Sequence, residues 1–324
     1  MKVHIAFPIT DEPTGGGNQF LRALRDHYAE REVYVEDPAI ADVVLYNSCQ
    51  YAAEVLRLKQ RYPAKVFVHR VDGPIRLYNR MSDRRDAVVH AANAAMADGT
   101  VFQSEYSRRA GRDLGLPVSR HEVVIPNAPD PQVFNRVKRV LPEDGRIELV
   151  AASWSDNINK GFDDYLWLDK HLDFTRYRMR FVGRSPVAFE NIEVVPPQSA
   201  DAVAALFAEA HLYITASRKD PCSNSLIEAV HRGLPVVALR DGGHPELVGD
   251  WGVLFDAIDQ VPELLLEIER NYARYSSGHQ LPMLEEVAER YFDFIRSVYD
   301  HSGGTGRPLS WLDAARLRWA VWRA

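Results

Sequence analysis

The chain has 324 residues, 46% of them hydrophobic and 26% charged, which predicts two folded domains and excludes global disorder. Its formal net charge of −6 argues against a general nucleic-acid-binding protein, which is usually basic. The only two cysteines, Cys49 and Cys222, lie far apart in the sequence, so we expect neither a disulfide framework nor a structural zinc site.

The chain opens on a strand pattern, MKVHIAFP, which lacks the apolar core and cleavage site of a secretory signal. No run of the sequence approaches the ~20 apolar residues that a membrane span needs. We therefore expect a cytoplasmic protein.

Short runs rich in valine and isoleucine alternate with amphipathic segments along the first part of the chain. The runs are KVHIAFP, EVYVE, DVVLYN, KVFVHR, GTVFQS and EVVIPN. Because they are continuously apolar, they are typical of strands in a parallel sheet that is buried on both faces. The first helical segment between them places Phe20, Leu21, Leu24 and Tyr28 on one face.

A polar connection, residues 136–146, separates this part from a second series of the same kind. Its runs are IELVAAS, YRMRFVG, IEVVP, LYITAS, LPVVALR and GVLF. Two successive Rossmann-like α/β domains are the simplest interpretation. We place them at residues 1–136 and 137–281, followed by C-terminal helices and a tail at 282–324.

Residues 310–324 form a helical pattern with an apolar face that is rich in tryptophan. The face comprises Trp311, Leu312, Ala315, Trp319 and Trp322, flanked by Arg316, Arg318 and Arg323. Because apolar helix stripes usually face a core, packing on a domain or on an oligomer partner is the favoured interpretation. Peripheral contact with an anionic membrane surface is the alternative.

The most informative segment, residues 212–249, runs from a strand through a polar loop into a helix and then into another strand. Ligands of open α/β sheets bind beyond the carboxyl ends of the strands, where this loop must lie. The helix begins around Asn224 or Ser225. There the backbone N–H groups of Ser223, Asn224 and Ser225 would be unpaired and could hold an anion such as a diphosphate.

Two carboxylates accompany this helix start, Asp220 in the loop and Glu228 about one turn into the helix. Carboxylates so placed can each accept hydrogen bonds from hydroxyls, one from a sugar ring and one from a ribose. On spacing alone, a helix cap with an exposed glutamate is the competing interpretation.

This segment resembles the donor-binding motif of the GT-B glycosyltransferases of family 4, E-x7-E followed by A-x-x-x-G-x-P-V-V-A and G-G-x-x-E-x-V. Here Asp220 and Glu228 are separated by seven residues and followed by AVHRGLPVVA and GGHPELV. The resemblance implies that Asp220 contacts the donor sugar, that Glu228 contacts the nucleotide ribose, and that Ser223 to Leu226 contact the sugar and phosphates. The first acid is Asp where the family has Glu, which shortens its reach by one methylene group.

Two further passages resemble the same family. In VVIPNAPDPQVF, Asn127, Asp130 and Phe134 match the interdomain passage, and in NKGFDDYLWL the residue Lys160 matches the lysine that binds the donor pyrophosphate. A fixed cation there would stabilise the charge on the departing diphosphate. Without the resemblance, a lone lysine is more often a solvated surface charge.

The chain departs from the family at a second cation. The family has Gly-Arg just after the first strand of the second domain, whereas this chain has Ser153-Trp154-Ser155. Arg184, which follows Gly183 at the next strand end, could replace the missing arginine in donor binding. A structural or surface arginine is the competing interpretation.

In the first domain, KVFVHRVDGP places His69 and Asp72 at the end of a strand. A strand-end histidine is more often a structural hydrogen-bonding residue, but the resemblance implies that His69 faces the cleft and contacts the donor sugar. Asp72 would contact the acceptor or cap the turn before Gly73. We therefore predict catalytic roles for His69, Asp72, Lys160 and Asp220.

Three consecutive glycines, Gly15 to Gly17 in TGGGNQF, directly precede the first helix. They lack the spacing of a G-x-G-x-x-G fingerprint, and no Lys-Ser/Thr follows as in a P-loop. They resemble the family's glycine loop, which implies that the backbone at Gly16 and Gly17 approaches the donor phosphates and the acceptor. A flexible turn is the alternative.

The resemblance spans most of residues 1–299 and implies a GT-B fold, with two Rossmann-like, doubly wound α/β domains facing across a cleft. A C-terminal helix at 282–299 would return to the first domain. The resemblance implies retaining transfer from a nucleotide-sugar, a UDP- or GDP-sugar, to a hydroxyl of a small-molecule, glycan or lipid-linked acceptor. Neither a metal nor another cofactor is expected. A nucleotide-sugar 2-epimerase of the same fold and a non-catalytic sugar-nucleotide-binding protein are the alternatives.

Overall fold

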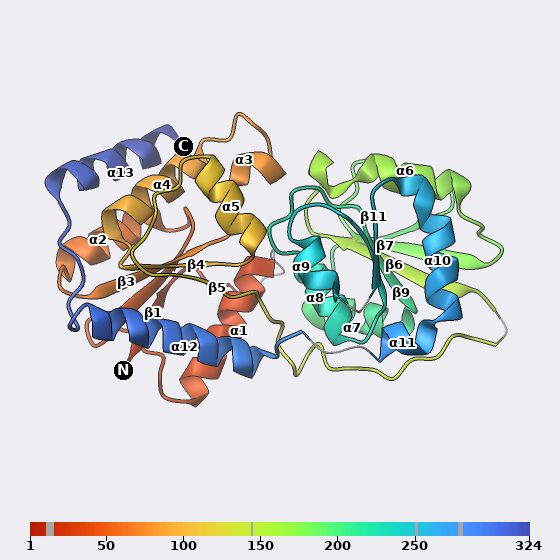
Figure 1. Ribbon diagram of the computed structural model, residues 1–324, viewed down its shortest axis with the longest axis horizontal. Helices are drawn as coiled ribbons and strands as arrows, with labels where there is room; N and C mark the ends of the chain where they lie inside the picture. The colour runs from red at the N-terminus through yellow and green to blue at the C-terminus, as the bar shows by residue number, and fades with distance from the viewer. Residues whose placement is uncertain (11–15, 144, 250–251, 278–280) are drawn as a thin grey trace. The chain divides into compact units, whose positions relative to one another are not determined.

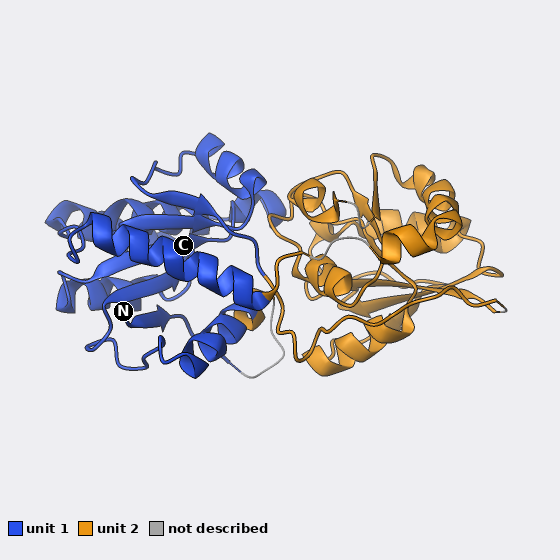
Figure 2. Ribbon diagram, turned by 60° about the horizontal axis from the view of Figure 1, so that its bottom comes forward, with its two compact units in different colours: residues 1–10, 20–127, 284–324 blue, residues 11–19, 128–283 orange. Residues whose placement is uncertain are grey.

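The computed structural model describes residues 1–10, 16–143, 145–249, 252–277 and 281–324 (Figure 1). The chain forms two compact units (Figure 2). Unit 1 comprises residues 1–10, 20–127 and 284–324, and unit 2 comprises the described residues of 11–19 and 128–283. Within the described part of the chain, no helix is long and apolar enough to cross a membrane.

Unit 1 is built on a five-stranded sheet in which all strands are parallel and follow the order β1-β2-β3-β4-β5. The strands are β1 (Val3–Ala6), β2 (Val43–Asn47), β3 (Val66–Val71), β4 (Gly99–Phe102) and β5 (Glu122–Val124). Every side chain of β2 and β3 is buried, because helices cover both faces of the sheet.

The predicted strand EVYVE is the run that does not form a strand. Tyr34 makes only an isolated bridge with Val3, on the edge of β1 that β2 does not occupy. The extended stretch is short because Glu32 before it has a φ of 55° and a turn at Asp37 follows it. The bridge still shows that the chain reverses direction at β1, as in a doubly wound sheet.

Seven helices are described in unit 1. They are α1 (Gly16–Glu30), whose first residues group with unit 2, α2 (Ala52–Arg61), α3 (Ile75–Tyr78), α4 (Arg85–Met96), α5 (Glu105–Asp113), α12 (Leu284–His301) and α13 (Trp311–Arg323). The apolar face of α1 is buried as its spacing predicts. Helix α12 packs on α1 and β4: the Tyr28 hydroxyl donates to the Ala288 carbonyl at 2.9 Å, and a Cβ on Gly99 would lie 2.7 Å from Val298.

Unit 2 contains a six-stranded parallel sheet in the order β11-β10-β9-β6-β7-β8. The strands are β6 (Ile147–Ser153), β7 (Tyr177–Gly183), β8 (Glu193–Val195), β9 (Leu212–Thr215), β10 (Val236–Leu239) and β11 (Gly252–Phe255). The chain first adds strands on one side of β6 and then returns to add β9 on the other side. This reversal marks the point where open α/β sheets bind ligands beyond the carboxyl ends of their strands.

The helical segments of unit 2 cover both faces of this sheet. They are η1 (Ile158–Lys160), α6 (Phe162–His171), α7 (Ala200–Glu209), α8 (Asn224–His231), α9 (His244–Val248), η3 (Ile258–Gln260), α10 (Val261–Arg270) and α11 (Tyr272–Ser276). One core lies under α6 and α10, and the other lies under α7 and α8. The sheet is therefore fixed from both sides, and its strand ends are rigid supports for the loops that leave them.

The division between the units lies at residues 127 and 128, earlier than the predicted connection at 136–146. Phe134 is buried among the side chains of α7 and α8, and the Arg232 guanidinium donates to the Asn135 carbonyl at 2.8 Å. Composition suggested a linker because the passage is polar, but the Val137 N–H donates to the Arg232 carbonyl at 3.2 Å, so the first residues of the connection also belong to unit 2.

Candidate active site

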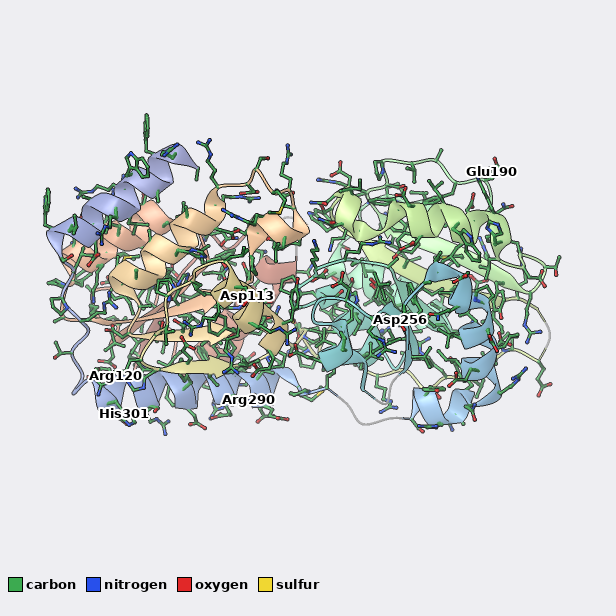
Figure 3. All side chains as sticks on the ribbon, turned by 45° about the horizontal axis from the view of Figure 1, so that its top comes forward. Asp113, Arg120, Glu190, Asp256, Arg290 and His301 are labelled. Carbon is green, nitrogen blue, oxygen red and sulfur yellow. The ribbon has the colours of Figure 1, made fainter. Side chains whose placement is uncertain are left out.

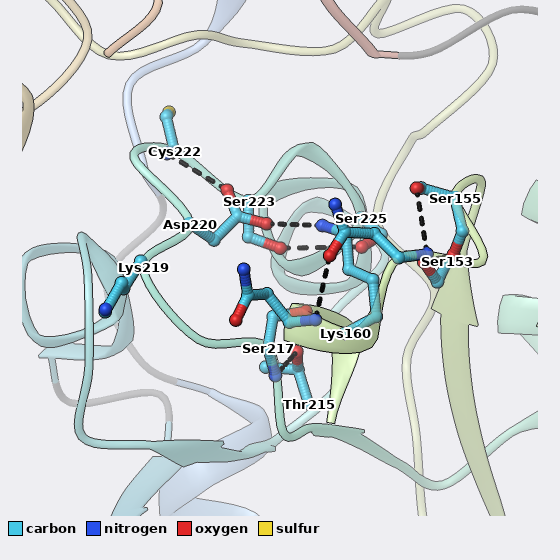
Figure 4. Close-up of polar contacts among 12 residues, drawn as sticks. Ser153, Ser155, Lys160, Thr215, Ser217, Lys219, Asp220, Cys222, Ser223 and Ser225 are labelled. Carbon is cyan, nitrogen blue, oxygen red and sulfur yellow. Dashed lines mark hydrogen bonds and ion pairs between the residues drawn. The ribbon is translucent and has the colours of Figure 1, made fainter. Parts of the chain in front are cut away.

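Lys160 and Asp220 form an ion pair at the carboxyl edge of the unit 2 sheet (Figure 4). The Lys160 Nζ lies 2.8 Å from Asp220 Oδ2, and the two side chains are 25% and 12% exposed. Burial opposes ionisation of Asp220, but the neighbouring Lys160 ammonium and His244 lower the pKa of its carboxyl below the ordinary value. The Asp220 carboxyl is therefore ionised at neutral pH, and both side chains keep some exposed surface.

The local backbone explains why Lys160 reaches this position. Asn157 caps η1, with its side-chain oxygen accepting from the Asn159 N–H at 2.9 Å. Gly161 then turns the chain into α6 with a φ of 79°, and a Cβ there would lie 2.3 Å from the carbonyl oxygen of Ala216. Only glycine allows η1 to approach the end of β9 this closely.

The N-terminus of α8 follows the Asp220 loop, and its helix starts at Asn224 as the sequence predicts. The Ser223 side chain makes no capping hydrogen bond to the first turn. Two hydrogen bonds fix the Ser225 side chain: its hydroxyl accepts from the Tyr213 hydroxyl at 2.7 Å and donates to the Ala152 carbonyl at 3.4 Å. Leu226 is fully buried, so only its backbone can face a ligand.

Glu228 lies one turn into α8 and has an unusual carboxyl group. No described residue pairs with it or hydrogen bonds to it, although the side chain keeps some exposed surface. Burial raises the pKa of the Glu228 carboxyl to about 8. A carboxyl group without a partner in the chain has its full acceptor capacity available to a ligand.

The turn at Gly242 packs against the Asp220 loop and completes the site from β10. Gly243 N–H donates to the Asp220 carbonyl at 2.8 Å, and a Cβ on Gly242, whose φ is 60°, would lie 2.4 Å from that oxygen. His244 follows, fully buried, with Nδ1 at 2.9 Å from the Leu239 carbonyl and Nε2 without a partner among the described residues. Our sequence analysis missed His244, although its place inside the G-G-x-x-E-x-V match marked it.

Arg184 and Trp154 lie together at the ends of β7 and β6. The Arg184 guanidinium carbon lies 5.3 Å from the centre of the Trp154 ring, and the Arg184 N–H donates to the Ser153 carbonyl at 3.1 Å. No described carboxylate pairs with Arg184, and its side chain is exposed. At Gly183 a Cβ would lie 1.8 Å from the Ser153 oxygen, so glycine is required for this approach. A cation–π contact between Arg184 and Trp154 therefore lies at this edge of the sheet.

Arg218, which no sequence motif marked, also contributes to this region. Its guanidinium donates to Asp164 at 2.7 Å, and its backbone N–H donates to the Asn159 carbonyl. Arg218 therefore braces the segment that carries Lys160.

Gly16 is the first residue of α1 and groups with unit 2. A Cβ on Gly16 would lie 2.3 Å from the side-chain nitrogen of Asn224, whereas a Cβ on Gly17 would meet nothing within 4 Å. The backbone at Gly16 therefore lies directly against the start of α8. Gly15 lies outside the described residues.

His69 lies in the interior of unit 1. Its ring is fully buried, stacks on Tyr46 with centroids 4.3 Å apart, and has its nitrogens 2.9 Å from Asn93 Oδ1 and 3.1 Å from the Ser48 carbonyl. Burial lowers the pKa of His69 to about 4. The expectation that this ring faces a cleft is therefore not met, because strand β3 is covered on both faces.

Asp72 belongs to a network of polar groups at the strand ends of unit 1. Its carboxylate accepts from Asn47 at 2.9 Å and also from Arg70 and Gln103. Arg70 is fully buried and donates in turn to Asn127 at 2.7 Å. Asp72 is thus held by side chains that the sequence analysis did not connect with it, and its own side chain remains 19% exposed.

Within the described ranges, no three His, Cys, Asp or Glu side chains are grouped so that they could hold a metal ion. The predicted donor residues of unit 2 do lie around one strand-end region, with Lys160 and Asp220 in direct contact. His69 and Asp72 belong to unit 1.

Part of the chain is similar in sequence to known proteins. Residues 168–273 match the family model "Glycosyl transferases group 1". Over 159 residues the chain is 26% identical to a probable sucrose-phosphate synthase of Thermosipho melanesiensis, an alignment that covers 46% of this chain and 38% of that relative. The chain therefore spans well under half the length of this curated relative.

Two solved structures are similar over almost the whole chain. Sucrose-phosphate synthase from Thermosynechococcus elongatus matches with a TM-score of 0.67 at 14% identity, covering 99% of this chain and 98% of that one. HepE from Anabaena, solved in complex with UDP-glucose, matches with a TM-score of 0.64 at 14% identity, covering 93% and 98%. The predicted fold class is confirmed: the chain has the GT-B fold, and its residues 168–273 match the glycosyl transferase group 1 model.

Proposed function

We propose that the protein transfers a glycosyl unit from a nucleotide-sugar to an acceptor hydroxyl, with retention at the anomeric carbon as in family 4. The observation that carries this proposal is the arrangement of charges around the start of α8. There the Lys160 ammonium, bonded to Asp220, lies in the same strand-end region as a helix N-terminus and the unpartnered carboxyl of Glu228.

In this proposal Lys160 and the N–H groups at the start of α8 hold the donor diphosphate. A helix N-terminus favours anions, and an ammonium has three donors, so Lys160 can keep Asp220 and still bind a phosphate oxygen. Arg184, held over Trp154, supplies the second cation as the leaving group gains charge. We propose that these groups, with no resident metal or other cofactor, neutralise the diphosphate.

Glu228 accepts hydrogen bonds from the ribose hydroxyls, and Asp220 accepts from a hydroxyl of the donor sugar. Because Asp220 also orients Lys160, it couples sugar recognition to the position of the cation. UDP is the favoured nucleotide, since HepE, the fold relative, was solved with UDP and with UDP-glucose.

The acceptor proton passes to the leaving diphosphate, so the transfer needs no protein base. This route suits the structure of unit 1, where His69 is buried and we now assign it a structural role. Asp72, which keeps exposed surface, is the remaining candidate in unit 1 for an acceptor contact.

The test is incubation with UDP- and GDP-sugars, singly and with acceptor panels, followed by measurement of released nucleoside diphosphate. We expect slow release with one donor and faster release when its acceptor is present. The Lys160→Ala variant should lose this activity, while Lys170→Ala, which removes an exposed lysine of α6, should keep it. Donor binding without turnover under all conditions would instead favour a non-catalytic sugar-nucleotide-binding protein.

A further inference from the structure

Helix α13 is anchored to unit 1 through one face. Ala314, Leu317 and Ala320 are buried against the apolar side chains of α2 and α4. The start of the helix is fixed as well, since the Ser310 hydroxyl accepts from the Asp313 N–H at 3.0 Å. The helix therefore presents a defined opposite face, for which the sequence favoured packing and left membrane contact as the alternative.

That opposite face exposes large apolar side chains. The exposed fractions are 82% for Trp311, 47% for Leu312, 58% for Trp319 and 80% for Trp322. We call these four residues the tryptophan face; side chains project from α13 away from the rest of unit 1 in Figure 3. Half of the chain's six tryptophans lie here, so this is not the scattered exposure that ordinary surfaces show.

Arginines flank the tryptophan face on both sides. At 100° per residue, Arg318 lies on one side of the face, and Arg316 and Arg323 lie on the other. The Arg323 guanidinium lies over the Trp319 ring at 4.5 Å, so charge and apolar surface form one patch. The single acid of the helix, Asp313, is engaged by Ser310 and by Arg316 at 3.6 Å.

We propose that the tryptophan face docks unit 1 onto an anionic lipid bilayer, with the helix lying in the plane of the interface. Tryptophan is favoured at the depth of the lipid headgroups because its ring is apolar and its indole N–H can still reach a polar partner. The flanking arginines meet lipid phosphates, while the chain as a whole carries a net charge of −6 and would be repelled without them.

Charge complementarity favours this occupant over a second copy of the chain. Two copies joined through the same face would be related by a two-fold axis and would bring two sets of arginines together. A bilayer with acidic headgroups supplies the opposite charge instead. The proposal concerns a surface of unit 1 and does not depend on the proposed reaction.

The test measures co-sedimentation of the full chain with vesicles of phosphatidylcholine containing about 30% phosphatidylglycerol, and with vesicles of phosphatidylcholine alone. We expect binding to the acidic vesicles, weakened by salt, together with a blue shift of the tryptophan fluorescence. Replacing Trp311, Trp319 and Trp322 together by alanine should reduce binding roughly tenfold or more.

Two control sets separate this patch from general surface effects. The first set replaces exposed apolar residues elsewhere on the chain by alanine, at Met81, Val118 and Val140. These substitutions should leave vesicle binding unchanged. Replacing the three flanking arginines by glutamine should also weaken binding roughly tenfold or more, with an unchanged circular dichroism spectrum. The same replacement by glutamine at Arg108, Arg240 and Arg296, whose side chains are each at least 42% exposed, should leave vesicle binding unchanged.

Absence of binding to the acidic vesicles would overturn the proposal, as would equal binding by the tryptophan variant. A dimer in sedimentation velocity that the tryptophan variant abolishes would also overturn it, because a second copy would then be the occupant.

Discussion

The ammonium of Lys160 lies 2.8 Å from the carboxylate of Asp220, so the predicted diphosphate cation and the predicted sugar-binding acid are bonded to each other. The resemblance assigned the two residues separate contacts with the donor. The structure joins them, and several expectations about the site depend on that bond.

Lys160 and Asp220 should act as one unit in donor use. We expect Lys160→Ala and Asp220→Ala each to lower kcat/KM for the donor roughly tenfold or more, since hydrogen bonds to charged groups contribute about 1.5–3 kcal/mol. The double variant should lose little more than either single variant, because each single change already disrupts the pair. Steady-state kinetics of the four proteins measures this, and additive losses would show that the residues act independently.

Donor affinity should depend on pH through Glu228. Burial raises the pKa of its carboxyl to about 8, so in the free protein this group is mostly protonated at pH 7. Ribose hydroxyls donate to the ionised form, so donor binding favours loss of the proton. Titration calorimetry should find that the donor Kd falls as the pH rises through about 8 and levels off above it.

Glu228→Gln should bind the donor more weakly and lose this pH dependence. Glu263→Gln, a matched change on the exposed side of α10, should retain it. The folded-state pKa of Glu228 lies above its ordinary value of 4.5, so the free energy of unfolding falls as the pH rises from about 4.5 to about 8 and levels off above that. The Glu228→Gln variant should therefore gain Tm relative to the parent protein across this pH range. A Kd of the parent protein that does not change across this range would contradict the assignment.

Gly16 and Gly17 should differ sharply in their tolerance of a methyl group. Gly16→Ala would place a Cβ 2.3 Å from Asn224 and should weaken donor binding by displacing the start of α8. Gly17→Ala meets nothing within 4 Å and serves as the control, with stability unchanged or raised by up to about 1 kcal/mol in the helix. Donor Kd and Tm measured on both variants test this, and equal effects would argue for a merely flexible turn.

Arg184 should matter for the reaction more than for the fold, since it is exposed and no described acid pairs with it. We expect Arg184→Ala to lower kcat/KM roughly tenfold, because a charged contact to the leaving group is lost. Trp154→Ala should show a smaller loss by releasing the guanidinium. Arg178→Ala, at a half-exposed arginine of β7, is the control. If the Arg184→Ala variant kept the kcat/KM of the parent protein, Arg184 would be an ordinary surface residue with no role in the reaction.

His69 should be required for stability. Its ring is fully buried and stacked on Tyr46, and each ring nitrogen lies within 3.1 Å of an oxygen atom, so His69→Ala leaves a cavity and unpaired polar groups. We expect a loss of about 2–4 kcal/mol in the free energy of unfolding, seen as a lower denaturant midpoint. The folded fraction should keep its kcat. A lost kcat at unchanged stability would restore the catalytic assignment.

The sequence predicted the fold well because the information was local. Residues adjacent in the chain are enough to predict the apolar strands, the helix start at Asn224 and the buried face of α1. The exception is EVYVE, which has the composition of a strand although only one of its residues forms a β-bridge, with β1. That pairing depends on tertiary structure, which the local sequence does not encode.

The sequence located several candidate residues of the site but not the contacts between them. Motif spacing located Lys160, Asp220 and Glu228, yet nothing in the sequence shows that two of them bond. Likewise, helical periodicity found the apolar stripe on α13, but the smaller side chains Ala314 and Ala320 take the core and leave the tryptophans outside. Packing against α2 and α4 determines which face of α13 is buried. These two helices lie more than 200 positions earlier in the chain.

The most direct test of the account is a crystal structure of the full chain soaked with UDP or with the donor that gives turnover. We expect the diphosphate on the N–H groups of Ser223 to Ser225 and within hydrogen-bonding distance of Lys160 Nζ, with the ribose hydroxyls on Glu228. A nucleotide bound elsewhere, with the Lys160–Asp220 pair and Glu228 untouched, would contradict it.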